Sequence, residues 1–341
     1  MTAVRHRALT MVQPGEPWVE VSREAAPLGS GEVRVEVRGV GVNYHDYANA
    51  LGFIPGPLPR VPMTDGAGVI TETGPGVEGW AVGDRVIGSF YPRWQAGPID
   101  EDLVTEVPGD TGDGWLQEQR ICRADELVPT PPHLDDVEAA SLPCAGTTAW
   151  SALELAGIGP GSVVVAMGTG GVSLFVLQLA KARGARVIVL SSSDDKLAIA
   201  GRLGADEMVN YNTHPDWHLS VRELTGDVGA DLVVDVAGEQ TLPTSIRAVR
   251  YGGTVAVVGV VSGMGSAELP ITHVMLRNIR VAGVTVGSVA DHRAMAAAVA
   301  DARIHPHLSH TFDWREAEDA IALVAAAGHV GKVGLVVPPS G

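Results

Sequence analysis

Three glycines stand where an apolar run meets a helical pattern, in the stretch VVVAMGTGGVSLFVLQLAKARGARVIVLSSSDDK at 163–196. Glycines at such a junction allow a tight turn and a close backbone approach to a pyrophosphate, whose charge then faces the helix start. Because the turn lies inside a complete strand–turn–helix–strand unit, it predicts a dinucleotide site. Ser173 takes the place of a usual third glycine, at some cost in helix–strand fit. The turn residues assigned to the site are Gly168, Gly170, Gly171 and Val172.

The end of the following apolar run indicates which dinucleotide. Sites that prefer NAD hold an acid about 20 residues after the turn, where it binds the ribose 2′-hydroxyl. Here the run ends at Ser191, so no carboxylate repels a 2′-phosphate. Ser192 could donate hydrogen bonds and Lys196 could supply charge, whereas Asp194 and Asp195 count slightly against a phosphate unless they point to solvent. We therefore predict NADPH rather than NADH.

The elements that must position this turn differ between the two halves of the chain. Segments such as GEVRVEVRGVGV at 31–42 alternate apolar and charged residues, which is typical of half-buried strands in a barrel-like β domain. From about residue 162, β-branched apolar runs alternate with helical patterns, which predicts a parallel sheet covered by helices. We predict an α/β chain with a substrate domain at 1–127, a doubly wound domain at 128–287 and a C-terminal return to the first domain at 288–341.

Composition excludes several classes of function. The net charge of −16 argues against a nucleic-acid or anionic membrane surface, since both need clustered basic residues. Two cysteines are too few for a disulfide framework. No uncharged apolar run reaches the roughly 18 residues of a membrane span, and the first residues lack a signal-peptide core. We expect a cytoplasmic protein. The acidic, aperiodic segment 93–114 is interpreted as a solvated loop, or alternatively as a lid or partner surface.

Five blocks of sequence carry a family resemblance. They are GVGVNYHDYANALG at 39–52, VPMTDGAGVITETGPGVEGWAVGDRVIG at 61–88, ASLPCAGTTAWSAL at 140–153, LQLAKARGARVI at 177–188 and GADEMVNY at 204–211. In order and spacing the chain resembles the medium-chain dehydrogenase/reductase superfamily, and within it the zinc-lacking quinone oxidoreductase-like branch. The resemblance implies a GroES-like substrate domain, a Rossmann domain, hydride transfer from a nicotinamide, and a homodimer joined near Val281–Gly287.

The positions that hold catalytic zinc in that family are changed in this chain. The first cysteine of the family matches Asn43, and its His–Glu pair matches Thr64 and Asp65. Only Cys144 keeps its ligand type, and one thiol with an amide and a hydroxyl is a poor zinc site. The family's four-cysteine lobe is also missing, because no cysteine lies between 90 and 121. We predict no zinc, and we interpret Cys144 as a buried small residue.

Other positions are carried over from the family one by one. Tyr211 matches a tyrosine beside the 2′-phosphate, although a core strand tyrosine is the alternative. Thr148 matches a residue near the cofactor phosphates and nicotinamide. Gly238 and Gly259 end strands at the carboxyl edge of the predicted sheet, where ligands bind in doubly wound folds. Asn43 matches an asparagine on the nicotinamide side of the cleft.

Candidate proton donors lie directly after Asn43, at Tyr44 and His45. A tyrosine donor found slightly later in some enoyl reductases is absent, since this chain has Phe53 and Ile54 there. Without zinc, hydride transfer to carbon fits best, with hydrogen-bond donors stabilising the enolate or quinol oxygen. We expect an NADPH-dependent reductase of quinones or α,β-unsaturated carbonyls. A zinc-free carbonyl reductase or alcohol dehydrogenase, and a cofactor-binding sensor or scaffold with little turnover, are the alternatives.

Overall fold

The computed structural model, which describes residues 5–263 and 265–339, divides into two units. The first unit comprises Met1–Thr147 and Gly287–Gly341, and the second comprises Thr148–Val286. The boundary predicted after residue 127 lies before the observed one, which follows Thr147. The strand β7 (Leu127–Pro129) still belongs to the first unit, because it pairs there with β5 (Arg85–Gly88). No described helix is both long and apolar enough to cross a membrane.

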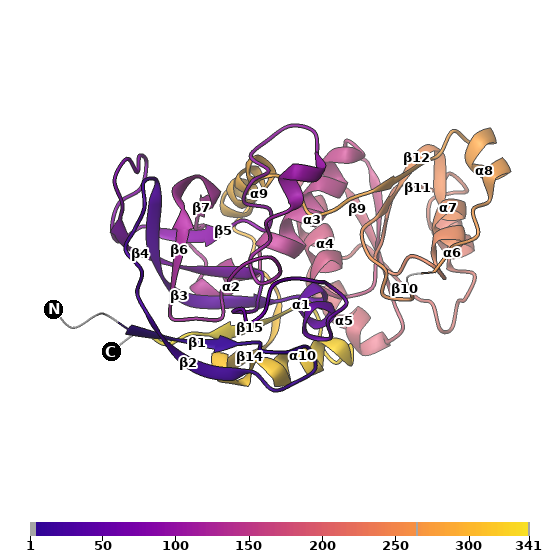
Figure 1. Ribbon diagram of the computed structural model, residues 1–341. Coiled ribbons are helices and arrows are strands. Elements are labelled where there is room, and N and C mark those ends of the chain that lie inside the picture. Colours follow the sequence, from indigo (N-terminus) through magenta and orange to yellow (C-terminus); the bar gives the residue numbers. More distant parts are fainter. Residues whose placement is uncertain (1–4, 264, 340–341) are drawn as a thin grey trace. The chain divides into compact units, whose positions relative to one another are not determined.

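The second unit is built on a parallel sheet, as the apolar runs predict. Its described strands run in the order β10-β9-β8-β11-β12-β13 (Figure 1). Counted from β8, this is the order 3-2-1-4-5-6 of a Rossmann fold, and it confirms the predicted doubly wound sheet. The strands are β8 (Val163–Met167), β9 (Arg186–Ser191), β10 (Glu207–Asn210), β11 (Ala230–Asp235), β12 (Val249–Val257) and β13 (Arg280–Gly283).

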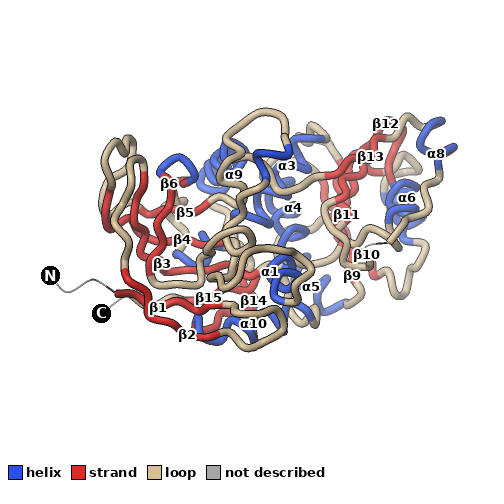
Figure 2. The backbone as a smooth tube through the Cα atoms, in the orientation of Figure 1, coloured by secondary structure: helices blue, strands red, loops and turns tan. Residues whose placement is uncertain are grey.

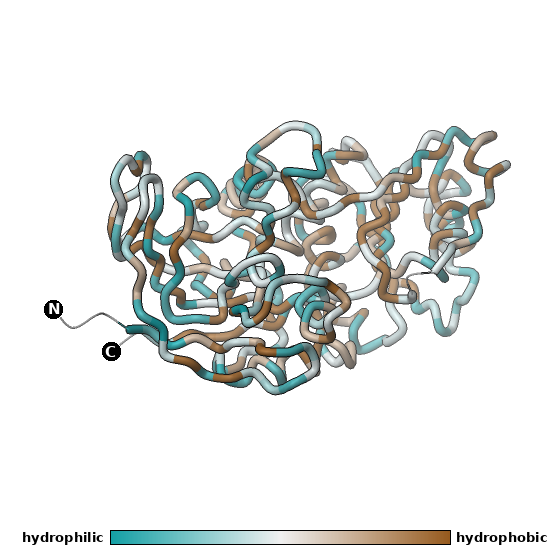
Figure 3. Tube along the Cα trace, viewed as in Figure 1, coloured by the Kyte–Doolittle hydropathy of each residue, from teal (hydrophilic) through white to brown (hydrophobic). Residues whose placement is uncertain are grey.

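Helices alternate with these strands along the chain and supply the packing that buries the sheet (Figure 2). The central strands are buried almost throughout and appear brown in the hydropathy view (Figure 3), as expected for strands covered on both faces. The helices are α4 (Gly171–Ala182), α5 (Asp194–Arg202), α6 (Trp217–Leu224), α7 (Leu242–Ala248) and α8 (Ile271–Leu276).

The first unit is built on a mainly antiparallel sheet. In the described residues the order is β14-β15-β3-β4-β5-β7, with β6 also paired to β3, while β1 and β2 form a separate pair. This is the predicted GroES-like domain. The strands not yet bounded are β1 (Arg5–Thr10), β2 (Val19–Glu24), β3 (Glu32–Val42), β4 (Asp65–Thr73), β6 (Gln119–Arg123), β14 (Leu308–Asp313) and β15 (Lys332–Val336).

The C-terminal segment returns to this sheet, as predicted. In Figure 1 the yellow β15 lies beside the indigo β3, with which it pairs antiparallel, and β14 pairs with the other side of β15. The buried Trp314 and Trp115 belong to one apolar core with residues of β3 and β15. The helices of this unit are α1 (Tyr44–Ala50), α2 (Asp136–Ala140), α9 (Val289–Asp301) and α10 (Ala317–Ala325), and α3 (Pro143–Leu155) spans the boundary between the units.

Candidate active site

The glycine turn has the local geometry that a phosphate site requires. Gly168 follows β8 with a φ of 80°, in the region that favours glycine, and Gly170 is the N-cap residue of α4. A Cβ atom at Gly170 would meet no atom within 4 Å, so the turn leaves space in front of the helix N-terminus. The turn follows β8, the strand at which the sheet order reverses, where doubly wound folds bind their ligands. Val172 lies in the first turn of α4.

Ser173 has a structural role that a glycine could not fill. Its buried hydroxyl donates a hydrogen bond of 2.5 Å to the carbonyl oxygen of Met167, the last residue of β8. This bond ties the first turn of α4 to the strand that precedes the glycine turn. The sequence led us to expect a substitution at some cost in fit, but the structure shows a compensating hydrogen bond.

Ser191, Ser192 and Tyr211 gather at the carboxyl ends of β9 and β10. The two strands are parallel neighbours with Asn210 opposite Ser191, and the amide of Tyr211 donates to the Ser191 carbonyl at 3.0 Å. Lys196 follows in the first turns of α5, whose N-cap is Ser193. The structure therefore brings Ser192, Lys196 and Tyr211 to one edge of the sheet.

Two acidic residues at the start of α5, Asp194 and Asp195, reduce the positive charge of this edge. The Asp194 carboxylate accepts a hydrogen bond of 2.7 Å from the side chain of Asn210, whereas no such bond was anticipated from the sequence. The side chain of Asn212 donates to the Ser192 carbonyl at 3.0 Å, which also links the segment after β10 to the segment after β9. Asp194 is held against β10 by this bond instead of simply pointing to solvent.

Gly238 and Gly259 lie just beyond the carboxyl ends of β11 and β12, on the edge predicted for the cofactor. Their backbones approach each other so closely that a Cβ atom at Gly238 would lie 2.9 Å from the Gly259 carbonyl oxygen. A Cβ atom at Gly259 would lie 2.4 Å from the carbonyl oxygen of Val236. Chain packing alone thus requires these glycines. Thr148 is buried within α3, at the start of the second unit.

A second cluster forms in the first unit where three strand ends meet. Antiparallel pairing sets the end of β3 beside the starts of both β15 and β4, with Val42 opposite Val333 and Gly41 opposite Asp65. Asn43 follows β3, while Lys332 begins β15. Residues far apart in sequence are therefore neighbours because the strands run in opposite directions.

A chain of hydrogen bonds joins these residues. The Lys332 ammonium donates to the Val42 carbonyl at 2.8 Å and to Asn43 Oδ1. Asn43 Nδ2 donates to Thr64 Oγ1 at 3.3 Å, and Thr64 Oγ1 donates to Asp65 Oδ1 at 3.3 Å. Lys332 is only 3% exposed, and lysine is rarely buried so deeply without partners.

Asp46 holds the same segment in place through backbone hydrogen bonds. Its carboxylate accepts hydrogen bonds from the backbone N–H groups of Asn43 at 2.8 Å and Thr64 at 3.1 Å. Burial raises the pKa of Asp46 to about 6, with the His45 charge and the two backbone bonds opposing the shift. Burial also raises the pKa of Asp65, although the charge of Lys332 opposes that rise.

His45 is paired with a carboxylate from a distant loop. His45 Nε2 lies 2.7 Å from Asp110 Oδ2, and Asp110 is itself held by Asn49. Burial disfavours the charged imidazole, but the hydrogen bond and charge of Asp110 outweigh it and raise the pKa of His45 above 6.5. Tyr44, the other predicted donor, is exposed and packs edge-on against Tyr47.

Sequence reasoning missed two of these residues. Asp110 belongs to the segment 93–114 that was interpreted as a solvated loop, yet it is 3% exposed and bonds to His45, so that interpretation is wrong at this position. Lys332 was not considered. Its signal was present, since a lone lysine begins the otherwise apolar β-strand KVGLV after a glycine.

The comparisons with known proteins agree with both units. Residues 29–132 match the family model "Alcohol dehydrogenase GroES-like domain", and residues 171–301 match "Zinc-binding dehydrogenase". A zinc-type alcohol dehydrogenase-like protein of Schizosaccharomyces pombe is 37% identical over 318 residues, covering 91% of this chain and 92% of that protein. The chain belongs to the medium-chain dehydrogenase/reductase superfamily.

Further similarities extend over most of this medium-chain dehydrogenase. An alcohol dehydrogenase of Geobacillus stearothermophilus is 34% identical over 278 residues, covering 79% of this chain and 81% of that protein. The crystal structure of an NAD-dependent alcohol dehydrogenase superposes with a TM-score of 0.89 at 34% identity, covering 97% of this chain and 100% of that chain. The protein is thus an alcohol dehydrogenase-like oxidoreductase.

The residues at the family's zinc position do not fit that metal. Asn43 and Thr64 offer an amide and a hydroxyl, and the Asn43 oxygen already accepts from the Lys332 ammonium. Cys144, which was expected to be buried, is partly exposed, and its thiol is the one group of the three that zinc commonly binds. Among the described residues, no group of three His, Cys, Asp or Glu side chains is placed to hold a metal.

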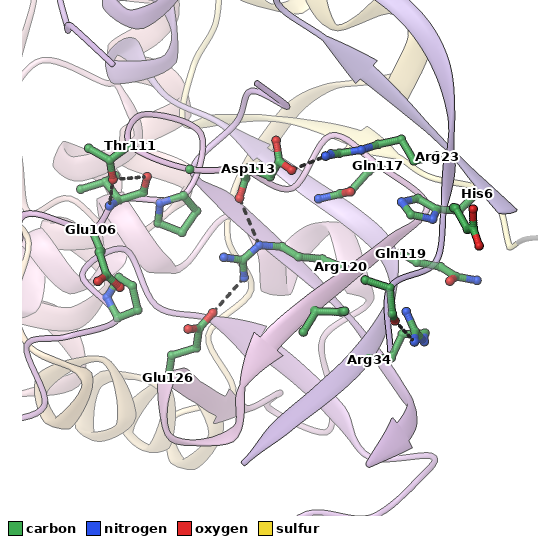
Figure 4. Close-up of a pocket in the computed structure, with 17 residues that line it drawn as sticks. His6, Arg23, Arg34, Glu106, Thr111, Asp113, Gln117, Gln119, Arg120 and Glu126 are labelled. Carbon is green, nitrogen blue, oxygen red and sulfur yellow. Dashed lines mark hydrogen bonds and ion pairs between the residues drawn. The ribbon is translucent and has the colours of Figure 1, made fainter. Parts of the chain in front are cut away.

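A separate hollow of about 580 Å³ lies in the first unit, lined by residues of 6–34 and 92–126. Figure 4 shows Arg120 between Asp113 and Glu126, and its Nη1 atom donates to the Glu126 carboxylate at 2.9 Å. Arg23 likewise pairs with Asp113 at 2.6 Å. Because carboxylates already neutralise these arginines, the hollow has no marked preference for an anion.

Proposed function

We propose that this protein is an NADPH-dependent reductase that transfers hydride to carbon in quinones or α,β-unsaturated carbonyls without zinc. The observation that supports this most directly is the pair Asn43 and Lys332, in which an amide stands where the family has a metal ligand and a buried ammonium lies beside it. Such donors suit an enolate or quinol oxygen, whose negative charge they stabilise as it forms.

The glycine turn and the edge beside it would hold the cofactor. Backbone N–H groups of Gly170, Gly171 and Val172 open α4 and can receive the pyrophosphate. Lys196, Ser192 and Tyr211 would receive the 2′-phosphate, while Thr148 would lie near the phosphates and nicotinamide. When bound, the reduced nicotinamide supplies the hydride.

His45 is the proton donor in this proposal. In the imidazolium form, Nε2–H donates to Asp110, and Nδ1–H remains to protonate the enolate or quinolate after hydride addition. Asp110 favours the imidazolium form, since its hydrogen bond and its charge raise the pKa of His45 against the opposing effect of burial. Tyr44 is the alternative donor, but no carboxylate is observed beside its hydroxyl among the described interactions.

One assay tests the reaction class. Purified protein is incubated with NADPH and a panel of quinones, enones, ketones and aldehydes. Oxidation of NADPH is followed by the loss of the absorbance of its reduced nicotinamide. The proposal requires turnover with quinones or enones at zinc content well below one ion per chain. Turnover confined to ketones or aldehydes would instead support a carbonyl reductase or alcohol dehydrogenase, the activity named for the relatives above.

We also propose a homodimer through the edge of the parallel sheet. In the part of the chain that the structure describes, the parallel sheet ends at β13, and α8, which precedes β13 in the chain, carries exposed Ile271, Met275 and Leu276. A second β13 pairing there would extend the sheet and cover this apolar surface. Light scattering should give twice the chain mass, and the double variant Met275→Glu/Leu276→Glu should be a folded monomer, with a Tm that no longer depends on protein concentration.

A further inference from the structure

We propose that five basic side chains of the second unit form a binding site for a small phosphate monoester that carries an apolar group. We call them the basic cluster, and they are His218, Arg222, Arg247, His273 and Arg277. They come from α6, α7 and the end of α8, and α7 contacts both other helices (Figure 1). None of them belongs to the glycine turn, the edge beside it or the residues around Asn43, so this site would exist whether or not the proposed function is correct.

The charge of the basic cluster is poorly balanced by carboxylates. Arg222 donates to the backbone carbonyl of Asp227, but its Nε lies 3.8 Å from Asp227 Oδ1, and that side chain is 90% exposed. Among the described residues, no ion pair is found for Arg247 or Arg277. The chain has 40 acidic residues against 24 lysines and arginines, so three arginines gathered without a close carboxylate depart from its composition. An anion from outside the chain would supply the missing negative charge.

The members of the basic cluster are close enough to act on one another. Burial lowers the pKa of His273, and the charges of Arg277 and Arg247 lower it further. Burial also lowers the pKa of His218, where the charge of Asp216 opposes the shift and that of Arg247 adds to it. Both histidines therefore sense Arg247, which lies on the helix between them. Like charges held this close repel one another, and a bound anion would remove that repulsion.

Four nitrogen atoms of the basic cluster are buried without a hydrogen-bond partner among the described residues. They are His218 Nδ1, Arg222 Nη1, His273 Nε2 and Arg277 Nη1. A guanidinium only donates hydrogen bonds, and a buried donor without an acceptor costs free energy that an acceptor would recover. His273 and Arg277 also line a hollow, so an acceptor bound in it would lie next to both side chains.

This hollow has a volume of about 490 Å³ and joins two kinds of side chain. Its lining includes the basic Arg247, His273 and Arg277, and the apolar or aromatic Tyr251, Ile271 and Leu276. The Arg277 guanidinium is held over the Tyr251 ring, with Cζ 5.0 Å from the ring centroid. The hollow therefore suits a ligand with an anionic head and an apolar body.

The charge of the cluster favours a phosphate over a carboxylate. A phosphate monoester carries a charge of about −1.5 to −2 at pH 7 and presents three acceptor oxygens, and the planar guanidinium binds phosphate through paired N–H groups. A carboxylate offers a single charge and two oxygens, so it would leave more of the cluster unbalanced. The apolar group of the monoester would contact Ile271 and Leu276, which are 68% and 67% exposed.

The test is a calorimetric titration with hexyl phosphate in the presence of NADP+, which fills the proposed cofactor site. Because Ile271 and Leu276 also belong to the surface proposed for the homodimer, it is made at a protein concentration where light scattering gives a single mass. We expect one hexyl phosphate per chain. Arg247→Gln and Arg277→Gln should each weaken binding by about tenfold, the equivalent of one lost charge-assisted contact. Hexanoate and inorganic phosphate should bind more weakly than hexyl phosphate.

The matched control is Arg202→Gln, at an exposed arginine in the last turn of α5 that does not line the hollow, and it should bind as the wild-type protein does. No binding by the wild-type protein, or equal weakening in Arg202→Gln, overturns the proposal. So does tighter binding of hexanoate than of hexyl phosphate. Binding that is lost in Lys196→Gln but kept in Arg277→Gln would assign the anion to the cofactor edge and would equally overturn it.

A second measurement needs no arginine variant, so it decides even if those variants fail to fold. A phosphate in the hollow should raise the pKa of His273, because a nearby negative charge favours the imidazolium. The titration of the His273 ring is followed by NMR with and without hexyl phosphate, and its signal is identified by its loss in His273→Gln. His310, an exposed histidine of the first unit, serves as the control. A His273 titration that hexyl phosphate leaves unchanged refutes the site.

Discussion

The glycine turn of the second unit and the Asn43 centre of the first are built in opposite ways. Gly168 to Ser173 are consecutive, and one strand–turn–helix supplies the entire geometry. The Asn43 centre, which we define as Asn43, His45, Asp46, Thr64, Asp65, Asp110 and Lys332, instead collects side chains from the start of α1, the start of β4, β15 and the loop after residue 104. A site made from one segment can be recognised in the sequence, whereas a site made from several depends on strand pairing.

The two regions also differ in how much charge they bury. The turn uses backbone N–H groups and needs no ionised side chain of its own. The centre buries Lys332, Asp46 and Asp65, all at most 3% exposed, and holds them with directed hydrogen bonds. Substitutions in the centre should therefore act on chemistry and pH dependence, and those around the turn on cofactor affinity and local stability.

The largest expected effect concerns His45 in the centre. Loss of the proton donor in His45→Asn should lower kcat/KM by about 10²- to 10⁴-fold while NADPH affinity is retained. In the wild-type protein the rate should fall as pH rises through the pKa of His45, which is raised above 6.5, and His45→Asn should lack this fall. The matched control is His305→Asn, at an exposed histidine whose Nδ1 lies 2.8 Å from Glu138 Oε1. Similar rates for both variants would remove His45 from the mechanism.

The second prediction concerns the stability of the centre. Because the pKa of Asp46 is raised from 3.8 to about 6, its contribution to stability is full below pH 3.8 and is lost as pH rises through about 6. Over that window the loss is about 3 kcal/mol. Urea unfolding of wild type and Asp46→Asn between pH 4 and 7 should show the difference in unfolding free energy changing by that amount in favour of the variant. If the difference in unfolding free energy between the two proteins stays constant over this pH range, the raised pKa of Asp46 is contradicted.

The third prediction moves to the cofactor edge of the second unit. Lys196→Gln should weaken NADPH binding by about tenfold, the equivalent of one lost charge-assisted contact, and leave NADH binding unchanged. Lys181→Gln, on the helix that follows the glycine turn, serves as the control and should affect neither nucleotide. Equal weakening of both nucleotides by Lys196→Gln, or tighter binding of NADH by the wild-type protein, would argue against a 2′-phosphate site. Calorimetric titration measures the affinity of each of the three proteins for each nucleotide.

The smallest effect is expected at Ser173. Ser173→Ala removes the hydrogen bond to the Met167 carbonyl and should cost about 1 kcal/mol of unfolding free energy. Ser173→Gly, which restores the third glycine, should cost more, since it adds the helix penalty of glycine. Thermal unfolding of the three proteins gives the ranking. A more stable Ser173→Gly protein would mean that the serine is only tolerated there.

Much of the second unit could be predicted from the sequence because its elements carry their own patterns. The apolar β-branched runs expected from about residue 162 include β8, β9 and β11. The exact start of β12 is a different case, because its first residue, Val249, directly follows the last residue of α7. Val249 pairs with Ala230 of β11, and this tertiary contact sets where the strand begins.

The first unit limits what its sequence can reveal. Asn43 and His45 were singled out from neighbouring residues, but their partners lie 289 and 65 positions away in the chain. The acidic segment has no periodic pattern that predicts the burial of Asp110. Asp110 is buried because it bonds to Asn49 and His45, which lie far from it in the sequence.

By itself the sequence determined the dinucleotide turn, the alternation that makes a parallel sheet, and the replacement of the family's zinc ligands. These depend on residue types at short spacing, and the backbone expresses them locally. Only the tertiary structure decided that Lys332 reaches Asn43 and that Asp110 reaches His45. The physical reason is that antiparallel pairing sets the register of β15 against β3, and that register brings an ammonium from the end of the chain to an amide near its beginning.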